Sequence, residues 1–571
     1  MILLLKRIFI ILCLLLGLAH FSSAHDDLQA EDDGLLASDE SGSGDDDALD
    51  VLIVGAGWAG MSAAHYLIQN APELKIAVLE SKNYTGGRTH AIKFGNPVDG
   101  PGEFIVEIGS NWIHGVPRME MGTANKNDYC GDNDNGTTNS CHNPTSEVEP
   151  NPVMELAERI GLGVIPADDI NHSVVVGIMR ELPMVYDRVG KDGDPDGSLR
   201  SRFAKAAHCL QQKVESKLIR PNSSIRDVLF ECGWNPQSDV EWAVDLAATE
   251  CSGSENDIET AQSLIDDTTF RIFGHADALV VDQHPRGYAR LIDALVDKSL
   301  PEGDRRIILN SHVVNIDYGI DCGHTEGKAS QVVVTTQDGR EFRAREVIVT
   351  FPLGVLQRHH STLFTPSLPE NLVKTLESGE IQMRNVTKVL LQFSDVWWDN
   401  SLPRWVSTNS GGSGTAEADH FSRWRNMNHQ STIPGSNILL GFLGGAQSAR
   451  YESMANPDAK VAVMSQLRNQ FPHIDIPDPV AFHITRHGSD PTRYGAFVVN
   501  TRDWSGDYEM FLDPITVCEN AVPRIRFGGE AFCGGLEGYT HGAYFSGIEV
   551  AGDVLSDFGI NPGTEMDSWC E

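Results

Sequence analysis

The sequence predicts an α/β fold, and three observations between residues 50 and 80 carry this prediction. The β-branched run DVLIV is followed at once by Gly55-x-Gly57-x-x-Gly60, and then by the helix-compatible stretch MSAAHYLIQN. A second apolar run, KIAVL, is followed directly by Glu80. Short β-branched runs are typical of buried parallel strands, and their alternation with a helix is typical of an α/β sheet.

The glycine spacing indicates what this fold binds. The first glycine makes the tight turn, the second lets the backbone approach a pyrophosphate, and the third lets helix and strand pack closely. The helix N-terminus then faces the phosphates. Glu80 follows Gly60 by about 20 residues, where a carboxylate accepts hydrogen bonds from ribose hydroxyls. These features predict a Rossmann-like dinucleotide-binding domain.

The N-terminus and the loop after Glu80 favour FAD as the dinucleotide. Residues 1–24 carry two basic residues, an apolar run and a small-residue end, as a signal peptide does. A signal anchor is the alternative, but the run is short for a bilayer span, and no stable membrane span is expected. The loop YTGGRT contains Gly87 and Arg88, and such a loop is typical of flavoproteins. Tightly held FAD travels with a secreted protein, whereas NAD would have to be found outside the cell.

Charge narrows the possible partners. The chain has 44 Lys and Arg against 80 Asp and Glu, a formal charge of −36. Residues 25–49 contain no Lys or Arg, and we interpret them as a disordered acidic leader. Nucleic acid is excluded as a partner because phosphate contacts need basic side chains. The negative charge would attract a cationic substrate. Alternatively, the acidity only keeps the protein soluble. The oligomeric state does not follow from the sequence.

Cysteines and sequons agree with export. Cys13 leaves with the signal, so an odd number of cysteines remains and at least one is a free thiol or forms an intermolecular bond. Cys130 and Cys141 bracket a polar loop and form the predicted disulfide. No cysteine or histidine has the spacing of a metal site. We expect the sequons at Asn135 and Asn222 to be accessible, and those at Asn83 and Asn385 to be unmodified because they lie inside candidate cofactor elements; a further sequon is at Asn171.

Several further segments, taken in order, resemble landmarks of the flavin-containing amine oxidase family, and are most similar to its polyamine oxidase branch. They are VEIGSNWIHGV (106–116), NPVMELAERIGL (151–162), PRGYARLIDALV (285–296), SHVVNIDYG (311–319), EVIVTFPLGVLQ (346–357), RNVTKVLLQF (384–393) and RIRFGGEAFCGGLEGYTHGAYFSGIEVAGDVL (524–555).

The resemblance implies a Rossmann-like FAD-binding domain interleaved with an α+β substrate-binding domain. The FAD-binding domain would comprise residues 50–118, 270–360 and 510–560. The substrate-binding domain would comprise residues 119–269 and 361–509. Segment 119–150 looks inserted relative to typical members, and we expect a surface loop that edges the entrance of the site.

Lys388 is the leading catalytic candidate. In the family, the matching lysine hydrogen-bonds a water near the flavin and assists its reoxidation by oxygen. From the pattern alone, a lysine in VTKVLLQF also fits an edge strand with its side chain in solvent.

The resemblance also implies an aromatic substrate site. Phe497 and Tyr539 would form a sandwich that holds a methylene chain and stabilises an adjacent cation, with Tyr544 as a further lining residue. His114 would contact a substrate amine and titrate near neutral pH. His487 stands where the family commonly has tryptophan, which leaves open the shape of the flavin-side wall and suggests a second titrating group. Any of these aromatic side chains could instead be simple core.

The remaining residues would contact FAD. Trp112 would neighbour the flavin, as would Thr540. The backbone of Val313 would meet the adenine, and Glu530 would approach the ribityl or phosphate region.

The expected reaction is oxidation of spermine, spermidine or their acetylated forms by hydride transfer to the flavin. It would give an aldehyde, a shorter amine and, with oxygen, hydrogen peroxide. Monoamine oxidases carry a C-terminal anchor, whereas this chain ends in the polar GINPGTEMDSWCE, and histone demethylases need a tower insertion that is not visible. The alternatives left open are a secreted L-amino acid oxidase, which needs a basic partner for the substrate carboxylate, another amine oxidase, and a non-catalytic secreted flavoprotein. The destination would be extracellular, cell wall or vacuole.

Overall fold

The computed structural model describes residues 48–117, 149–166, 184–187, 190–220, 222–249, 269–274, 276–319, 331–408, 421–500, 510–517, 522–562 and 569–570. The predicted signal peptide, nearly all of the acidic leader and of segment 119–150, the predicted Cys130–Cys141 pair and the sequons at Asn135 and Asn171 lie outside the described residues.

A nine-stranded sheet carries the glycine fingerprint. Its order is β13-β10-β11-β12-β1-β2-β9, with β22 on β12 and β21 on β22. β1 is parallel to both β2 and β12, and Val54 is in register with Leu79 and Val349. The three strands therefore end at one edge of the sheet. The bounds are β1 (Leu49–Val54), β2 (Ile76–Leu79), β9 (Ile307–Ile308), β10 (Val313–Asp317), β11 (Val332–Thr336), β12 (Glu341–Val349), β13 (Phe364–Thr365), β21 (Ile515–Val517) and β22 (Val522–Phe527).

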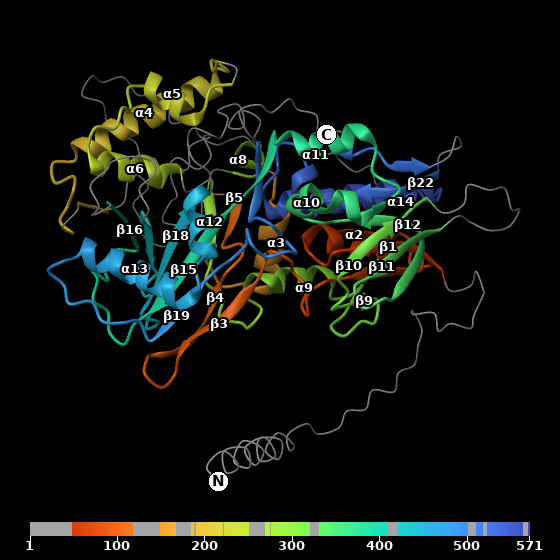
Figure 1. Ribbon diagram of the computed structural model, residues 1–571, viewed down its shortest axis with the longest axis horizontal. Coiled ribbons are helices and arrows are strands. Elements are labelled where there is room, and N and C mark those ends of the chain that lie inside the picture. Colours follow the sequence, from red (N-terminus) through yellow and green to blue (C-terminus); the bar gives the residue numbers. More distant parts are fainter. Residues whose placement is uncertain are drawn as a thin grey trace, which may run out of the picture. The chain divides into compact units, whose positions relative to one another are not determined.

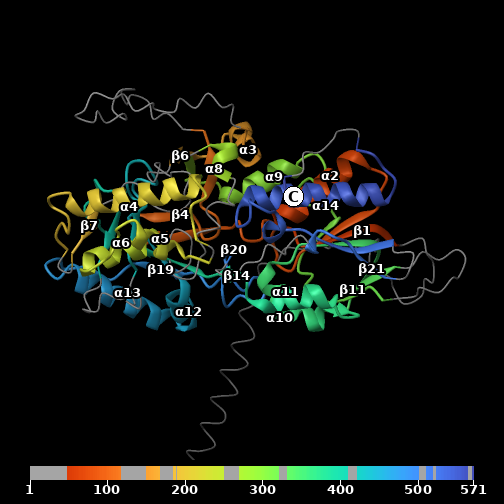
Figure 2. The ribbon, with the colours of Figure 1, turned by 90° about the horizontal axis from the view of Figure 1, so that it is seen from above.

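Helices cover both faces of this sheet. In Figure 2, α2 (Trp58–Asn70) and α14 (Thr540–Asp557) lie on one side of β1, and α10 (Leu353–Leu363) and α11 (Glu370–Ser378) lie on the other. Small residues let α2 and α14 approach closely, since a Cβ at Gly547 would lie 2.2 Å from the carbonyl oxygen of Ala59. α3 (Pro152–Ile160) and α9 (Arg290–Val296) complete the core on the α2 side.

A second, six-stranded sheet has the order β19-β15-β18-β17-β16-β7. Figure 1 shows it with α12 and α13 beside it, and with α4, α5 and α6 nearby. An aromatic-rich core that includes Trp405, Trp424 and Phe421 packs between this sheet and the two helices α12 and α13. The bounds are β7 (Met184–Tyr186), β15 (Val386–Gln392), β16 (Arg404–Ser407), β17 (Arg423–Asn426), β18 (Ile438–Gly444), β19 (Ala481–Ile484), α4 (Ser198–Glu215), α5 (Ile225–Glu231), α6 (Asp239–Thr249), α12 (Gly445–Ser453) and α13 (Asn456–Gln470).

Smaller sheets connect distant parts of the sequence. β5 (Trp112–Val116), β8 (Ala276–Val280) and β6 (Val164–Pro166) form one, with α8 (Thr269–Phe273) against β5; β14 (Ile381–Arg384) and β20 (Phe497–Asn500) form another; β3 (Ala91–Asn96) and β4 (Gly102–Glu107) form the third. The predicted α/β fold is confirmed, while the proposed domain boundaries stay a prediction. Among the described helices, none is both long and apolar enough to cross a bilayer.

Candidate active site

A single cavity of about 830 Å³ extends from the ends of β1 and β2 to the face of the six-stranded sheet. It brings together most of the residues singled out in the sequence, which are more than 400 positions apart at the extremes. The predicted residues that line it are Gly55, Gly57, Glu80, Gly87, Arg88, Trp112, His114, Val313, Lys388, His487, Phe497, Glu530, Tyr539 and Thr540.

The three fingerprint glycines differ in what surrounds them. Gly55 has φ +113°, and a Cβ there would lie 2.3 Å from Oγ1 of Thr350. A Cβ at Gly57, the N-cap of α2, would meet no atom within 4 Å. Gly60 does not line the cavity, and its Cβ would lie 1.9 Å from the carbonyl oxygen of Gly55. Gly57 therefore leaves its backbone open to the cavity, while Gly60 serves the packing of helix on strand.

Glu80 lies directly after β2, and its carboxylate is held across the turn. Oε2 accepts a hydrogen bond from the amide of Ala56 at 2.9 Å, and Oε1 accepts one from the amide of Lys82 at 2.8 Å. The backbone carbonyl oxygen of Glu80 also accepts a hydrogen bond from the amide of Ser311 at 2.7 Å. This bond brings the segment that leads into Val313 to the same end of the cavity.

Arg88 and Glu530 tie the glycine-rich loop to the C-terminal cofactor element. Nη1 of Arg88 lies 2.5 Å from Oε1 of Glu530, whose Oε2 accepts a hydrogen bond from the amide of Gly538 at 3.1 Å. Nη1 also donates to the carbonyl of Ala496 at 3.2 Å. Because Glu530 is buried, this ion pair neutralises a charge that would otherwise be costly to enclose.

Lys388 lies on the cavity face of β15, an interior strand between β18 and β19. The interpretation as an edge-strand lysine in solvent is therefore wrong. Its Nζ donates hydrogen bonds to the carbonyl of Gly109 and to Oδ1 of Asn111. Burial lowers the pKa of Lys388 to about 7, against the opposing attraction of the Glu107 carboxylate. Such a group changes its charge near neutral pH.

Glu107, at the end of β4, is the acid whose charge acts on the pKa of Lys388. Oε1 accepts a hydrogen bond from the amide of Tyr288 at 2.7 Å. Burial raises the pKa of Glu107 to about 7, while this hydrogen bond and Lys388 oppose the rise. Sequence reasoning missed it, although a carboxylate after the apolar run FIV was a visible signal.

His114 is paired with an acid that the sequence did not single out. Its Nδ1 lies 3.1 Å from Oδ1 of Asp277, a buried residue of β8 that also lines the cavity. The ring of Tyr539 packs edge-on against His114, with centroids 5.3 Å apart. The ring of Trp112 also lies near His114, with ring centroids 6.3 Å apart. An acid inside the apolar run ADALVV was the only signal for Asp277.

The two predicted sandwich residues lie near each other. Phe497 begins β20, and a Cβ at Gly538 would lie 3.7 Å from its Cδ2. Tyr539 follows Gly538 and stacks on the ring of His541 at 5.0 Å. Both aromatic rings line the cavity.

The structure does not bring Tyr544 to the cavity. Its ring packs beside Phe545 and against the core that α2, α3 and α14 share. Its carbonyl accepts a hydrogen bond from Oγ of Ser62 at 3.0 Å, so this turn of α14 faces α2. Thr540, one turn earlier, lies at the cavity and its Oγ1 is 3.1 Å from the hydroxyl of Tyr288.

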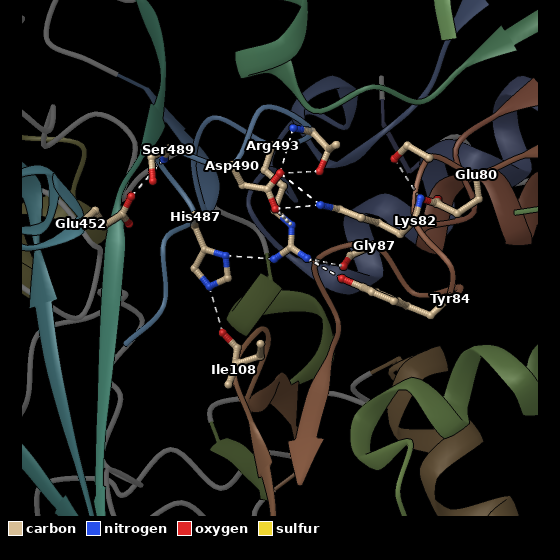
Figure 3. Close-up of polar contacts among 12 residues, drawn as sticks. Glu80, Lys82, Tyr84, Gly87, Ile108, Glu452, His487, Ser489, Asp490 and Arg493 are labelled. Carbon is tan, nitrogen blue, oxygen red and sulfur yellow. Dashed lines mark hydrogen bonds and ion pairs between the residues drawn. The ribbon is translucent and has the colours of Figure 1, made fainter. Parts of the chain in front are cut away.

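His487 is locked in one neutral form by Arg493 (Figure 3). Nη1 of Arg493 donates to Nδ1 of His487 at 3.0 Å, and Nε2 of His487 donates to the carbonyl of Ile108 at 2.9 Å. Burial and the Arg493 charge lower the pKa of His487 to about 3. The expectation of a second titrating group is wrong, because the histidine stays neutral at physiological pH.

Arg493 is itself the centre of a buried network in Figure 3. Nη2 donates to the hydroxyl of Tyr84 at 2.9 Å and to the carbonyl of Gly87 at 3.3 Å. Its Nε lies 3.5 Å from Asp490, which also pairs with Lys82 at 3.0 Å. The network links the segment around His487 to the glycine-rich loop, and nothing local in the sequence indicated it.

Two disulfides were missed. Cys209 pairs with Cys232, and Cys533 pairs with Cys570. Asn222 is exposed as expected, but Asn83 is also exposed, so its place in a cofactor element does not shield it.

Comparison with known proteins agrees with this geometry. The sequence model of a family described as flavin containing amine oxidoreductase matches residues 58–555. Polyamine oxidase 1 of Zea mays is 26% identical over 524 residues, 88% of this chain and 89% of that protein. Lysine-specific histone demethylase 1 homolog 2 of Oryza sativa subsp. japonica is 24% identical over 518 residues, 89% of this chain and 57% of that protein.

A solved structure, the cyclohexylamine oxidase from Brevibacterium oxydans, superimposes with a TM-score of 0.57 at 17% identity, over 90% of this chain and 100% of that chain. At this identity the likeness concerns the fold. Together the comparisons confirm the resemblance seen in the sequence.

The cavity residues fit the flavin cofactor of that family. Where Gly57 and Gly87 face each other, the missing side chains leave a cradle, since a Cβ at Gly87 would already lie 3.3 Å from Cα of Gly57. The open N-terminus of α2 suits a pyrophosphate, and Glu80 suits a ribose. FAD is the cofactor of this chain.

Proposed function

Because the chain belongs to the flavin-containing amine oxidoreductase family, we propose that it is a secreted, FAD-dependent oxidase of polyamines. The substrates would be spermine, spermidine or acetylated forms, and the products an aldehyde, a shorter amine and hydrogen peroxide. Similarity to the polyamine oxidase of Zea mays over most of both chains supports the substrate class.

One observation carries the proposal: the buried Asp277 carboxylate lines the cavity and contacts His114, which lies beside the rings of Trp112 and Tyr539. A carboxylate attracts an alkylammonium group, and aromatic walls accept both its charge and its methylene chain. His114 is about one third exposed and lines the cavity, so its ring is accessible to a substrate amine. This arrangement binds a cation and can also take up its proton.

Each part of the site would then have a separate task. Bound FAD would supply the two-electron redox chemistry, as acceptor for the hydride from the carbon beside the amine nitrogen and with oxygen as the final oxidant. Trp112, Phe497 and Tyr539 would orient the chain and exclude water. The His114–Asp277 pair would bind the amine and receive its proton, because the amine must be neutral to react. Lys388, fixed by Gly109 and Asn111, would assist the oxygen step.

Secretion is supported by the N-terminal sequence and by two disulfides among the described residues. Cys209–Cys232 and Cys533–Cys570 are disulfides, which persist in oxidising compartments. Expression of the full chain with a C-terminal epitope, followed by N-terminal sequencing of secreted protein, tests this part. A protein retained inside the cell with residues 1–24 intact would contradict it.

Peroxide formation tests the substrate class. Purified holoenzyme is supplied with spermine, spermidine, N-acetylspermine, cyclohexylamine and a histone tail peptide with a methylated lysine, and products are identified by mass spectrometry. We expect turnover of the polyamines and release of an aldehyde. Turnover of the methylated peptide or of cyclohexylamine alone would reject the proposal. As a control, His114→Gln should raise KM for polyamines.

A further inference from the structure

Arg423 lies in the active-site cavity, and no role has been assigned to it above. It is the first residue of β17, and its side chain lines the same cavity as Lys388. The register of the six-stranded sheet pairs Lys388 with Phe442 and Phe442 with Arg423. Directly opposed residues of antiparallel strands present their side chains on one face. Lys388, Phe442 and Arg423 therefore form a row across three strands, facing the cavity.

Among the residues that the structure describes, no carboxylate lies within ion-pair distance of the Arg423 guanidinium. Its recorded contact is the ring of Phe442, whose centroid is 5.5 Å from Cζ. A cation over an aromatic ring keeps its full charge and its hydrogen-bond donors.

Arg423 lies away from the reacting end of the site. Two strand spacings place its Cα about 10 Å from that of Lys388, and Phe442 stands between them. A long substrate whose amine lies at the His114–Asp277 pair can extend its far end toward the Arg423 guanidinium.

An apolar path joins the two ends. The ring centroids of His114 and Trp112 are 6.3 Å apart, and those of Trp112 and Phe442 are 5.8 Å apart. The guanidinium of Arg423 lies next along this line, over the ring of Phe442. One end of this path carries the Asp277 carboxylate and suits an ammonium group. The other end carries a guanidinium, which repels a second ammonium group but donates hydrogen bonds to a carbonyl oxygen.

We propose that Arg423 is a specificity-determining residue that selects polyamines whose far end is acylated over polyamines whose far end is a free ammonium group. This inference rests on the proposed polyamine oxidation and narrows its substrate class. The acyl carbonyl would accept from the guanidinium, while removal of the terminal charge would relieve repulsion.

The test compares kcat/KM for N-acetylspermine and spermine in holoenzyme. We expect the wild type to prefer N-acetylspermine, and Arg423→Gln to reduce the ratio of the two values by about tenfold or more. Arg423→Lys keeps the charge and should keep most of the preference. Arg404→Gln, on the neighbouring strand and outside the cavity lining, should leave the ratio at the wild-type value. An unchanged ratio in Arg423→Gln would overturn the assignment.

A binding measurement separates failure of this inference from failure of the proposed function. If no polyamine is oxidised, the proposed function is wrong, but ligand binding can still be followed through the change in flavin absorption. N-acetylspermine should then bind more tightly than spermine to the wild type and not to Arg423→Gln. Equal affinities in the wild type, or tighter binding of L-leucine than of either polyamine, would reject the role given to Arg423.

Discussion

Lys388 and Asn111 are 277 positions apart in the chain, and the lysine Nζ donates a hydrogen bond to the asparagine Oδ1 inside the cavity. A second hydrogen bond, to the carbonyl of Gly109, fixes the same nitrogen. A buried lysine held by two neutral acceptors has no solvent to stabilise its charge, which accounts for its low pKa. The lysine amine is therefore held against segment 106–116 and can exist in its neutral form.

Lys388→Met tests this position. We expect the variant to bind FAD and to slow the reoxidation of the reduced flavin by oxygen at least about tenfold, and to slow reduction by amine less. Stopped-flow absorbance measures both half-reactions. Lys93→Met is the control, because Lys93 pairs with Glu103 at the surface. Reoxidation at the wild-type rate would remove the role assigned to Lys388.

Glu107 predicts a pH dependence of stability. Its folded pKa of about 7 lies above the unfolded value of 4.5, so the folded protein binds the extra proton and stability falls as the pH rises from about 4.5 to about 7. The loss is up to about 3 kcal/mol. Lys388 acts in the opposite sense at higher pH, because its folded pKa of about 7 lies below the unfolded value of 10.5 and stability rises between them.

Denaturant unfolding from pH 4.5 to 10 checks both slopes. Glu107→Gln keeps an acceptor for the Tyr288 amide but cannot ionise, so its free energy of unfolding should lack the fall below pH 7. Wild-type and variant curves that run parallel in this range would contradict the account.

Arg493→Met is expected to lower the free energy of unfolding by about 2–4 kcal/mol. The change leaves the His487 Nδ1 and the Tyr84 hydroxyl without their buried donor. FAD affinity should also fall, because the loop carbonyl of Gly87 loses a contact. Arg358→Met is the control, since Arg358 is exposed and stacks on Tyr494. Equal losses in the two variants would show that the network is unimportant.

Gly57→Ala and Gly60→Ala separate cofactor binding from folding. The Gly57 site has room for a methyl group in the protein itself, so apoprotein stability should stay close to wild type, while FAD affinity falls at least about tenfold. Gly60→Ala forces a methyl group against the Gly55 carbonyl and should lower the free energy of unfolding of the apoprotein by about 3 kcal/mol or more. Apoprotein unfolding and FAD titration measure the two effects. Similar apoprotein losses in both variants would refute the distinction.

The part of the site that was predictable from sequence depends on local signals. Gly55, Gly57, Gly60 and Glu80 belong to one strand–turn–helix–strand unit, whose geometry follows from a continuous segment. Lys388 was ambiguous on its pattern, because nothing local says whether a strand is interior or at an edge. Only the order of strands around β15 decides that.

The rest depends on contacts between distant segments. Tyr544 was expected at the cavity with Thr540, but α14 packs so closely on α2 that this turn faces the core. Asp277 looked like an isolated acid until β8 paired with β5 and set it beside His114. The roles of Arg493 and His487 follow only from their contact in the structure, since the arginine fixes which nitrogen of the histidine accepts a hydrogen bond.

The central claim is that this cavity oxidises polyamines on FAD, and anaerobic bleaching of the flavin absorbance tests it most directly. Purified holoenzyme is mixed without oxygen with spermine, spermidine, N-acetylspermine, a monoamine and L-leucine in parallel. The account predicts rapid bleaching by polyamines and little by the monoamine or by leucine. Bleaching by leucine or the monoamine alone, or no bleaching by any of the five, would contradict it.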